Sequence, residues 1–518
     1  MNESGFGRIS IRHLWIFAVL IGIFVFVNTH PIRPHDFWWH MAIGREIVEG
    51  GGIPQADAYS QAMAGQTYSS YKMYWLADVG LYSVYKLGGA ALSVLVQSLI
   101  ITLAYAVIFL LCFRVSLSLR VAAFGTIFAA SLGLNNWNLR PQIVTYLLGA
   151  LFLWAIYEYR MRPRKGWLLV FPAAMMLWVN CHGSFPIGLL LLGIWLLDEV
   201  FQALRTRLSA PGLSGDGAQT RDDAGIGFRR VLPPVIALSI TILAALVNPR
   251  GIGVFGYIIT MSTNSVVQNL VPEWAPPSFN TTGGTMFIVG LLLSALILAL
   301  SPRRPGSFQV ICFLSFAVLA LKTTRGIIWY GLVLAPVMSD HVSALSSKLR
   351  RPGRAPASPG GVPAINLAFL VLMLLMAFAS LPWFKDSLRF PESKAGLIHV
   401  ETPVEATEFL LERRPQPPVF HAMSYGSYLI WAAQPEYRVF VDSRIELYPR
   451  EIWHDYLRIS NAQCGWEKSL ERYGINTLML SRTEQPALVD TATASWAWQE
   501  VYHDRHAVIF VRAEVPAQ

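Results

Sequence analysis

The long apolar stretches of this chain constrain its fold more than any other feature. A helix needs about 17–25 mostly apolar residues to cross a bilayer, and about eleven stretches are of this kind, some of them interrupted by Pro or Gly. Hydrophobic residues make up 54% of the chain and charged residues 14%, outside the range of an ordinary soluble domain. The sequence therefore predicts a polytopic α-helical membrane protein. Its predicted spans lie near 13–29, 90–112, 118–134, 143–159, 167–180, 186–204, 231–247, 284–301, 307–321, 326–340 and 364–384.

Positive charge predicts how the spans are oriented, because Lys and Arg are retained on the cytoplasmic side of short loops. Arg8 and Arg12 precede the first stretch, so we expect the N-terminus inside. An odd number of spans then places the C-terminal region outside. Most of the net charge of +9 comes from the Lys and Arg residues that indicate the orientation of the spans. These residues are distributed among several short loops, which argues against nucleic-acid binding. The later segments on the inner side are indeed basic: 114–120, 160–165, 205–230, 303–304 and 348–354.

Composition divides the chain into two unequal domains. We expect a transmembrane domain over 1–385, in which residues 30–89 form the first outer loop and contain amphipathic helices. Residues 206–229, rich in Gly, Ser, Ala and Asp, predict a flexible cytoplasmic linker. Strand-like and helical runs alternate over 390–518 and predict a small extracytoplasmic α/β domain. Its strands are expected at 418–422, 437–444 and 475–481, followed by a closing hairpin.

Several polar clusters between the spans fall on the predicted outer side. Because the topology places them on one rim, together with the first outer loop, we expect them to share a cavity. One reaction centre at this membrane face is the economical interpretation. The clusters are NNWNLRPQ (135–142), NCHGSF (180–185), NPRG (248–251), VPEW (271–274) and KTTRG (322–326).

The best-placed carboxylate for chemistry is Asp36, just beyond the first span, where it could act as a general base on an acceptor hydroxyl or amine. Arg140, Arg250 and Arg325 could hold the phosphate of a lipid-linked donor. Simpler explanations exist for each residue. Asp36 could only cap the following helix, and Arg140 and Arg250 could only snorkel to lipid headgroups. Arg325 lies between two short spans with little loop around it, which favours a buried functional partner.

Other residues could line the same cavity or contact a substrate: Trp38, Trp39, His40, Asp78, His182 and Glu273. The two tryptophans could pack against a sugar face or a polyprenyl chain, although their residue type and position favour anchoring at the membrane interface. His40 follows Asp36 by four residues and shares its helix face, so a divalent metal held by this pair is an alternative, although two ligands do not make a site. The sequence therefore leaves the cofactor open.

The C-terminal domain contributes three alternating charged residues, Asp442, Arg444 and Glu446, directly after a predicted strand. Alternation places their side chains on one face of the strand. Such a face could recognise an acceptor, or it could be a set of ion pairs at the end of a strand.

Seven blocks of the sequence, taken in order, resemble the GT-C type membrane glycosyltransferases of the bacterial RgtA/B/C/D-like group, over most of the chain. The resemblance implies a multi-span enzyme that uses a polyprenyl-phosphate sugar, with a catalytic aspartate in the first outer loop, here Asp36. It also implies a location in the bacterial inner membrane. One departure is Tyr74, because relatives often have His beside the tryptophan that is here Trp75. The blocks are DFWWHMAIGREIVEGGGIPQADAYS (36–60), YWLADVGLYSVYKLGG (74–89), RPQIVTYLL, WVNCHGSF, NPRG, YGSYLIW and RVFVDSRIELY (438–448).

Three functions are compatible with these observations. The first is an inverting glycosyltransferase that moves a sugar from a polyprenyl-phosphate donor to an extracytoplasmic glycan, lipid or protein acceptor. The second is a transporter or flippase of lipid-linked sugars, which should show ionisable or helix-breaking positions near the bilayer middle and matched halves. The polar residues collect at one rim instead, which favours the transferase. The third is a non-catalytic envelope assembly protein.

Overall fold

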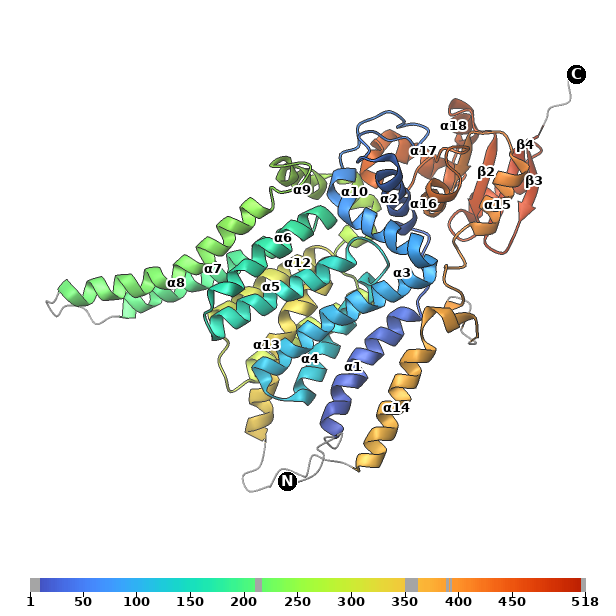
Figure 1. Cartoon of the computed structure of the whole chain (residues 1–518). Coiled ribbons are helices and arrows are strands. Elements are labelled where there is room, and N and C mark those ends of the chain that lie inside the picture. Colours follow the sequence, from blue (N-terminus) through green and yellow to red (C-terminus); the bar gives the residue numbers. More distant parts are fainter. Residues whose placement is uncertain (1–9, 210–216, 350–361, 388–390, 392–393, 514–518) are drawn as a thin grey trace, which may run out of the picture.

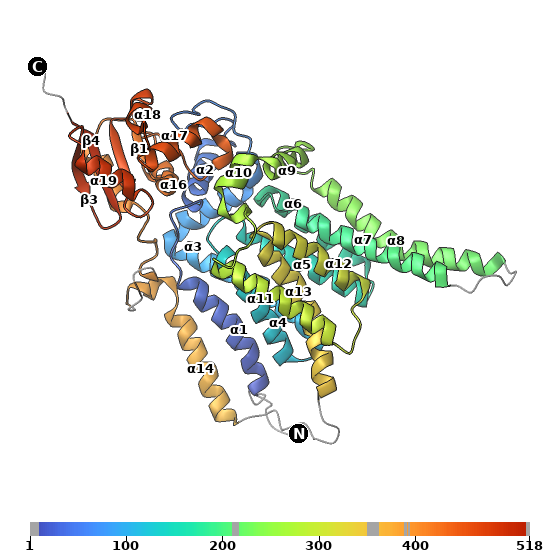
Figure 2. The same cartoon turned by 180° about the vertical axis from the view of Figure 1, so that it is seen from behind.

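The computed structural model describes residues 10–209, 217–349, 362–387, 391 and 394–513. Most of these residues form a tilted bundle of helices, and a smaller α/β domain sits at one end of the bundle (Figure 1). Helices α11, α12 and α13 lie toward the viewer when the molecule is seen from behind (Figure 2). The helices of the bundle and its outer loops are α1 (Ile11–Asn28), α2 (Phe37–Gly50), α3 (Tyr71–Ser116), α4 (Leu119–Gly133), α5 (Ile143–Met161), α6 (Val170–Cys181), α7 (Pro186–Ser209), α8 (Gly217–Ala244), α9 (Gly253–Thr263), α10 (Ser265–Leu270), α11 (Thr282–Leu300), α12 (Ser307–Lys322), α13 (Gly326–Leu349) and α14 (Pro363–Ala379).

Every predicted span coincides with a helix of the bundle. Within the described residues, five helices are long and apolar enough to cross a membrane, namely α1, α3, α7, α11 and α13. The other six predicted spans correspond to α4, α5, α6, α8, α12 and α14, so the count of eleven spans stays a prediction. Large apolar side chains such as Leu292, Leu296, Leu372 and Leu375 are exposed on α11 and α14. An apolar outer surface of this extent belongs in lipid, so the chain is an integral membrane protein.

The linker that was predicted over 206–229 falls partly outside the described residues. Its described portion is helical, because α7 runs to Ser209 and α8 begins at Gly217. The two helices lie side by side and extend away from the bundle (Figure 1). The structure describes residues 217–229 as helix that continues into the apolar part of α8, and the flexible linker stays a prediction.

Helix α3 changes direction at Gly88 and Gly89, whose backbone is not helical. Gly89 has φ +63°, a conformation that glycine adopts without steric cost. The part of α3 before this kink lies beside α2 rather than inside the bundle. The two helices approach closely at Gly44, where an added Cβ would lie 2.2 Å from the carbonyl oxygen of Asp78. This close approach places the backbone of Asp78 directly against α2 at Gly44.

The C-terminal domain contains a four-stranded sheet of order β1-β2-β4-β3. Strands β1 and β2 pair in parallel, whereas β2 with β4 and β3 with β4 pair antiparallel. Residues 437–444 are not a strand as predicted, since Val439 alone bridges to Ser60 of the first outer loop. Helix α19 (Pro486–Ala494) was not predicted. The other elements are α15 (Val404–Arg413), β1 (Val419–His421), α16 (Met423–Ala432), α17 (Arg450–Ser460), α18 (Trp466–Arg472), β2 (Thr477–Ser481), β3 (Trp498–His503) and β4 (Ala507–Arg512).

The C-terminal domain packs on the first outer loop through α2 and α16. Trp38 is 1% exposed, and its ring meets Tyr428 edge to face with centroids 5.0 Å apart. The backbone N–H of Trp39 donates to Ser427 Oγ over 3.0 Å. Both side chains are buried within the protein. Trp38 belongs to the hydrophobic cluster of the membrane helices and Trp39 to that of the C-terminal domain, so the two residues lie where these clusters meet.

Candidate functional site

A cavity of about 470 Å³ lies where the first outer loop, the outer ends of the bundle helices and the C-terminal domain meet. Its wall is drawn from distant parts of the sequence: segments 33–40, 135–142, 270–274 and 443–446, together with His182 and Arg325. The predicted clusters around 135–142, 180–185, 271–274 and 322–326 thus share one cavity. The cluster at 248–251 contributes no residue to its wall.

Asp36 lines this cavity at the residue that precedes α2. Its side chain makes no capping hydrogen bond to the helix, and its backbone is helical, with φ −57° and ψ −32°. Oδ2 lies 3.4 Å from Nη1 of Arg140, and 27% of the side chain is exposed. The carboxylate is therefore directed to the cavity and to an arginine rather than to the helix end.

Arg140 and Arg325 share one acidic partner, Glu273, in the short 3₁₀ turn Pro272–Trp274. Arg140 Nη2 donates to Oε1 over 2.9 Å and Nη1 to Oε2 over 3.3 Å, while Arg325 Nε donates to Oε2 over 2.8 Å. Burial alone would raise the pKa of Glu273, but the two guanidinium charges outweigh it and lower this pKa to about 2. The carboxylate of Glu273 thus binds both arginines in the way that an anionic oxygen of a ligand could bind them.

His40 also lines the cavity, and a residue that does not line the cavity fixes the orientation of its ring. Its Nδ1 lies 2.7 Å from Oδ1 of Asp78, a residue that is fully buried and lines no part of the cavity. The ring stacks on Trp39, with centroids 3.6 Å apart, and meets Tyr74 edge-on. Because the Asp78 carboxylate only accepts, it holds the proton on Nδ1 and leaves Nε2 as the free nitrogen. Asp78 thus positions His40 and does not contact the cavity as predicted.

His182 reaches the cavity from the residue after α6. The backbone N–H of Ser184 donates to its Nδ1 over 3.1 Å, which places the ring proton on Nε2. Burial, reinforced by the charges of Arg325 and Arg140, lowers the pKa of His182 well below its ordinary value. It therefore offers the cavity a neutral hydrogen-bond donor and not a positive charge.

The predicted metal pair is not formed, because the side chains of Asp36 and His40 have different partners, Arg140 and Asp78. Within the part of the chain that the structure describes, no group of three or more His, Cys, Asp or Glu residues could hold a metal ion. The chemistry available to the described residues is that of carboxylates, arginines and imidazoles.

Arg250 does not line the cavity, unlike the other two arginines that were predicted to bind phosphate. Its Nη1 donates to the carbonyl oxygen of Ser69 over 2.7 Å, and its guanidinium lies 4.7 Å from the ring centroid of Tyr257. The side chain thus ties the loop at 248–251 to the segment before α3, and its predicted contact with a donor phosphate has no support from this position.

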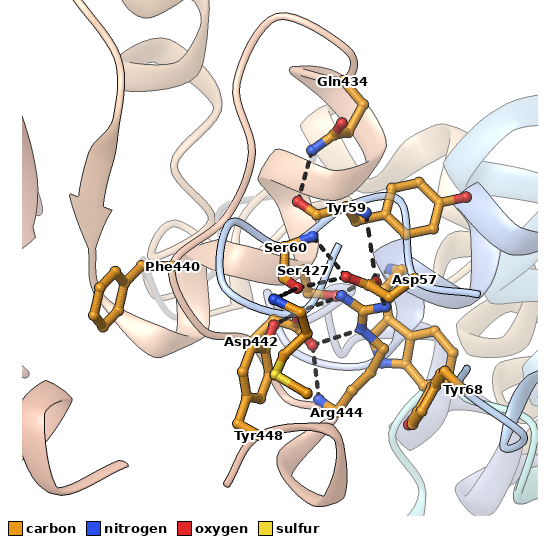
Figure 3. A network of polar contacts seen from close by, with 12 residues as sticks. Asp57, Tyr59, Ser60, Tyr68, Ser427, Gln434, Phe440, Asp442, Arg444 and Tyr448 are labelled. Carbon is orange, nitrogen blue, oxygen red and sulfur yellow. Dashed lines mark hydrogen bonds and ion pairs between the residues drawn. The ribbon is translucent and has the colours of Figure 1, made fainter. Parts of the chain in front are cut away.

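Asp442 and Arg444 belong to a buried network between the two domains (Figure 3). Of the two carboxylates predicted in this segment, that of Glu446 lines the cavity and that of Asp442 does not. Arg444 Nη1 donates to Asp57 Oδ1 over 2.6 Å, and Nε and Nη2 donate to Asp442 over 2.8 and 2.6 Å. All three side chains are 0% exposed. Burial would raise the pKa of Asp57, but the Arg444 charge and hydrogen bonds from Ser60 lower it. We call this set, Asp57, Arg444 and Asp442, the interdomain latch.

Sequence reasoning missed five polar residues of the cavity wall: Arg33, His35, Tyr68, Tyr74 and Ser443. Arg33 and His35 are exposed and lie within three residues of Asp36, so proximity to the predicted base was a usable signal. Among the described residues, neither is in an ion pair. No comparable signal identified Tyr68, whose position depends on the contact between the first outer loop and the C-terminal domain.

No family model matches the sequence, and no curated protein is similar to it in sequence. The apo oligosaccharyltransferase of Archaeoglobus fulgidus aligns with 99% of this chain and 76% of its own, at a TM-score of 0.55 and 12% identity. The arabinofuranosyltransferase AftD from Mycobacteria aligns with 99% of this chain at a TM-score of 0.55 and 13% identity, and the match spans 42% of AftD. ArnT from Cupriavidus metallidurans aligns at a TM-score of 0.42 and 14% identity, and the fold assignment does not depend on it.

The first two alignments and the apolar bundle define the class of this protein: it is a polytopic membrane protein with a cavity between one end of its helix bundle and a C-terminal α/β domain. More specifically, the chain shares its fold with the Archaeoglobus fulgidus oligosaccharyltransferase and with AftD.

Proposed function

We propose that this protein is a membrane glycosyltransferase that moves a sugar from a polyprenyl-phosphate donor to an acceptor outside the cytoplasm. The observation that carries the proposal is the position of Asp36. It lies between α1 and α2, at the residue that precedes α2, on the wall of the cavity, without a capping role and beside Arg140. The fold and the sequence blocks around Asp36 support the same function. A donor anchored in the bilayer could reach a cavity at this level with its sugar.

In the proposed reaction Asp36 accepts the proton of an acceptor hydroxyl or amine as that atom attacks the anomeric carbon. The new glycosidic bond forms while the bond from the anomeric carbon to the phosphate oxygen breaks. The polyprenyl phosphate leaves with the electron pair. Attack opposite the leaving group inverts the anomeric centre, as expected of a single displacement.

Arg140 and Arg325 are the proposed partners of the donor phosphate, where they would stabilise the charge that grows on the leaving oxygen. Both line the cavity and are already held in place by Glu273. Arg33 adds a positive charge without an ionic partner among the described residues. Trp39, His40 and His182 offer a ring face and two imidazole edges to the sugar.

The test is lipid mass spectrometry on cells that lack this protein and are complemented at matched expression. We expect the null strain and the Asp36→Asn strain to accumulate a polyprenyl-phosphate sugar that wild type consumes, with transfer reduced about 100- to 10,000-fold. Asp490→Asn, an exposed position on α19, is the matched control and should behave as wild type. If Asp36→Asn consumes the lipid as wild type does, Asp36 is not the base.

The transporter alternative predicts a different lipid result. A flippase mutant would retain the lipid-linked sugar in the inner leaflet, whereas a transferase mutant would retain it in the outer leaflet. Accessibility of the accumulated lipid to a membrane-impermeant periodate probe separates the two. Catalysis-independent assembly would leave the lipid pool unchanged in every strain.

A further inference from the structure

Glu446 differs from the other carboxylates of the cavity. Asp36 and Glu273 each face an arginine, whereas Glu446, in the 3₁₀ turn Ile445–Leu447, makes no ion pair within the described part of the chain. Its neighbour in sequence on the cavity wall, Arg444, is fully engaged by Asp57 and Asp442. Within the described ranges, the carboxylate of Glu446 therefore has only neutral hydroxyls as hydrogen-bond partners.

Both of these hydroxyls contact the same oxygen. Tyr68 Oη donates to Oε1 over 2.6 Å and Ser70 Oγ to Oε1 over 3.0 Å. Burial, together with the charge of Glu446, raises the pKa of Tyr68 well above its ordinary value, so Tyr68 remains a donor. Oε2 has no hydrogen bond to any described residue. A carboxylate oxygen accepts two hydrogen bonds, so this side of Glu446 has capacity for a ligand.

The surroundings restrict which ligand fits. The rings of Tyr68 and Tyr74 and the apolar side chains of Val267, Ile445 and Met423 line the same cavity. A sugar ring presents C–H faces to such surfaces and hydroxyls at its edge, and an ionised carboxylate forms short, strong bonds with hydroxyl donors. An anionic group at this position would be repelled, because no described cation pairs with Glu446.

We propose that Glu446 binds a hydroxyl group of an uncharged sugar in the acceptor, so that the C-terminal domain supplies the acceptor side of the cavity. The inference rests on the proposed function and names the acceptor class for it. The carboxylate is pre-positioned, because Tyr68 and Ser70 hold it from the first outer loop and the interdomain latch fixes the backbone two residues before it. A site built to hydrogen-bond a hydroxyl discriminates strongly against the analogue that lacks it.

A binding measurement tests this without requiring transfer. The purified full-length protein, in a detergent without a sugar headgroup, is titrated with a panel of methyl glycosides and followed by intrinsic tryptophan fluorescence, because Trp39 and Trp274 line the cavity. We expect Glu446→Gln to weaken binding of the preferred glycoside about 10- to 100-fold. The deoxy analogue that lacks the contacted hydroxyl should bind equally weakly to wild type and variant.

Two further variants show whether an effect is specific to Glu446: the first is a control for the loss of a negative charge, and the second removes a hydrogen-bond partner of Glu446. Glu451→Gln removes an exposed carboxylate of the same domain and should bind as wild type. Tyr68→Phe keeps the ring but removes one hydroxyl from Glu446 and should weaken binding about 3- to 10-fold. Unfolding midpoints within about 2 °C of wild type show that the variants are folded.

The outcomes separate this inference from the proposed function. Equal glycoside affinity of wild type and Glu446→Gln, or no glycoside binding by wild type, overturns the inference. Tighter binding of methyl 2-aminoglycosides, lost in Glu446→Gln, overturns the uncharged class and assigns a cationic acceptor. If wild type binds methyl glycosides but transfers nothing from polyprenyl-phosphate sugars, the site at Glu446 stands and the transferase proposal fails. If transfer occurs, Glu446→Gln should raise the acceptor KM and change kcat less than about 3-fold.

Discussion

Two clusters in this protein share one motif and differ in accessibility, and in the cavity a second arginine, Arg325, also pairs with Glu273. Each consists of one arginine between two carboxylates, of which one comes from the first outer loop: Asp57 in the interdomain latch and Asp36 in the cavity. In the latch, the side chains are 0% exposed and Arg444 is satisfied by Asp57, Asp442 and Tyr71. In the cavity, Asp36 is 27% exposed, and the buried Nε of Arg140 has no hydrogen-bond partner among the residues that the structure describes.

The difference shows what burial does to identical chemistry. In the latch, tyrosine hydroxyls bind the charged groups in addition to their ionic partners. The charged side chains therefore bind one another and join the two domains. The cavity cluster keeps its charges accessible, so a substrate can replace or share a partner. Charge composition alone therefore does not distinguish a structural network from a reactive one. The decisive property is which donors and acceptors remain unmatched.

The largest effect on this comparison should come from breaking the latch. Arg444→Met leaves Asp57 and Asp442 buried without a counter-charge and should destabilise the protein by about 3–5 kcal/mol. Thermal unfolding of the purified protein measures this. Arg472→Met removes an arginine that pairs with Asp455 at an exposed position and should cost about 1 kcal/mol or less. Similar losses for both variants would show that the latch is not a structural centre.

A smaller effect should follow from removing a cavity arginine. Arg325→Gln should raise the KM for the polyprenyl-phosphate donor about 10-fold, because one charged contact to the phosphate is lost, and should leave the unfolding midpoint nearly unchanged. Arg250→Gln is the matched comparison, since Arg250 lies outside the cavity wall. We expect its donor KM to change less than about 3-fold. Equal changes in both variants would contradict the assignment of the phosphate site to the cavity.

The smallest expected effect is on the pH dependence of the reaction rate. The pKa of Glu273 is lowered to about 2, so its stabilising contribution is complete above about pH 4.5 and is lost only as the pH falls from there toward 2. Glu273 therefore does not titrate between pH 5 and 9. The pH–rate profile of Glu273→Gln should keep any acid limb that wild type shows in this range, with its midpoint moved by less than about one pH unit. Loss of that limb in the variant would identify Glu273 as the titrating group.

The helical part of the fold was predictable because the signal is local. An apolar stretch long enough to span a bilayer defines a helix regardless of its neighbours, and the predicted stretches all coincide with helices. The shared cavity was predictable for a related reason. Alternating topology places every second loop on the same side, so the segments containing Arg140, His182, Glu273 and Arg325 had to meet near one rim.

Pairing across long sequence separations was not predictable. Asp57 and Arg444 are 387 residues apart and Arg140 and Glu273 are 133 apart, and no periodicity connects such partners. The run at 437–444 has the alternation of a strand, but its backbone pairs with the first outer loop only at Val439. Trp38 is of the residue type that anchors proteins at the membrane interface, and its burial becomes evident only from the position of the C-terminal domain.

The cavity wall extends in sequence from Arg33 to Glu446, and this span has a consequence for biogenesis. Synthesis proceeds from the N-terminus, so the membrane helices and the first outer loop emerge long before the residues that cover Trp38 and Trp39. Until the C-terminal domain has been synthesised and has folded, Arg444 cannot meet Asp57, and the cavity lacks one wall. The cavity is thus complete only after nearly the whole chain has been made.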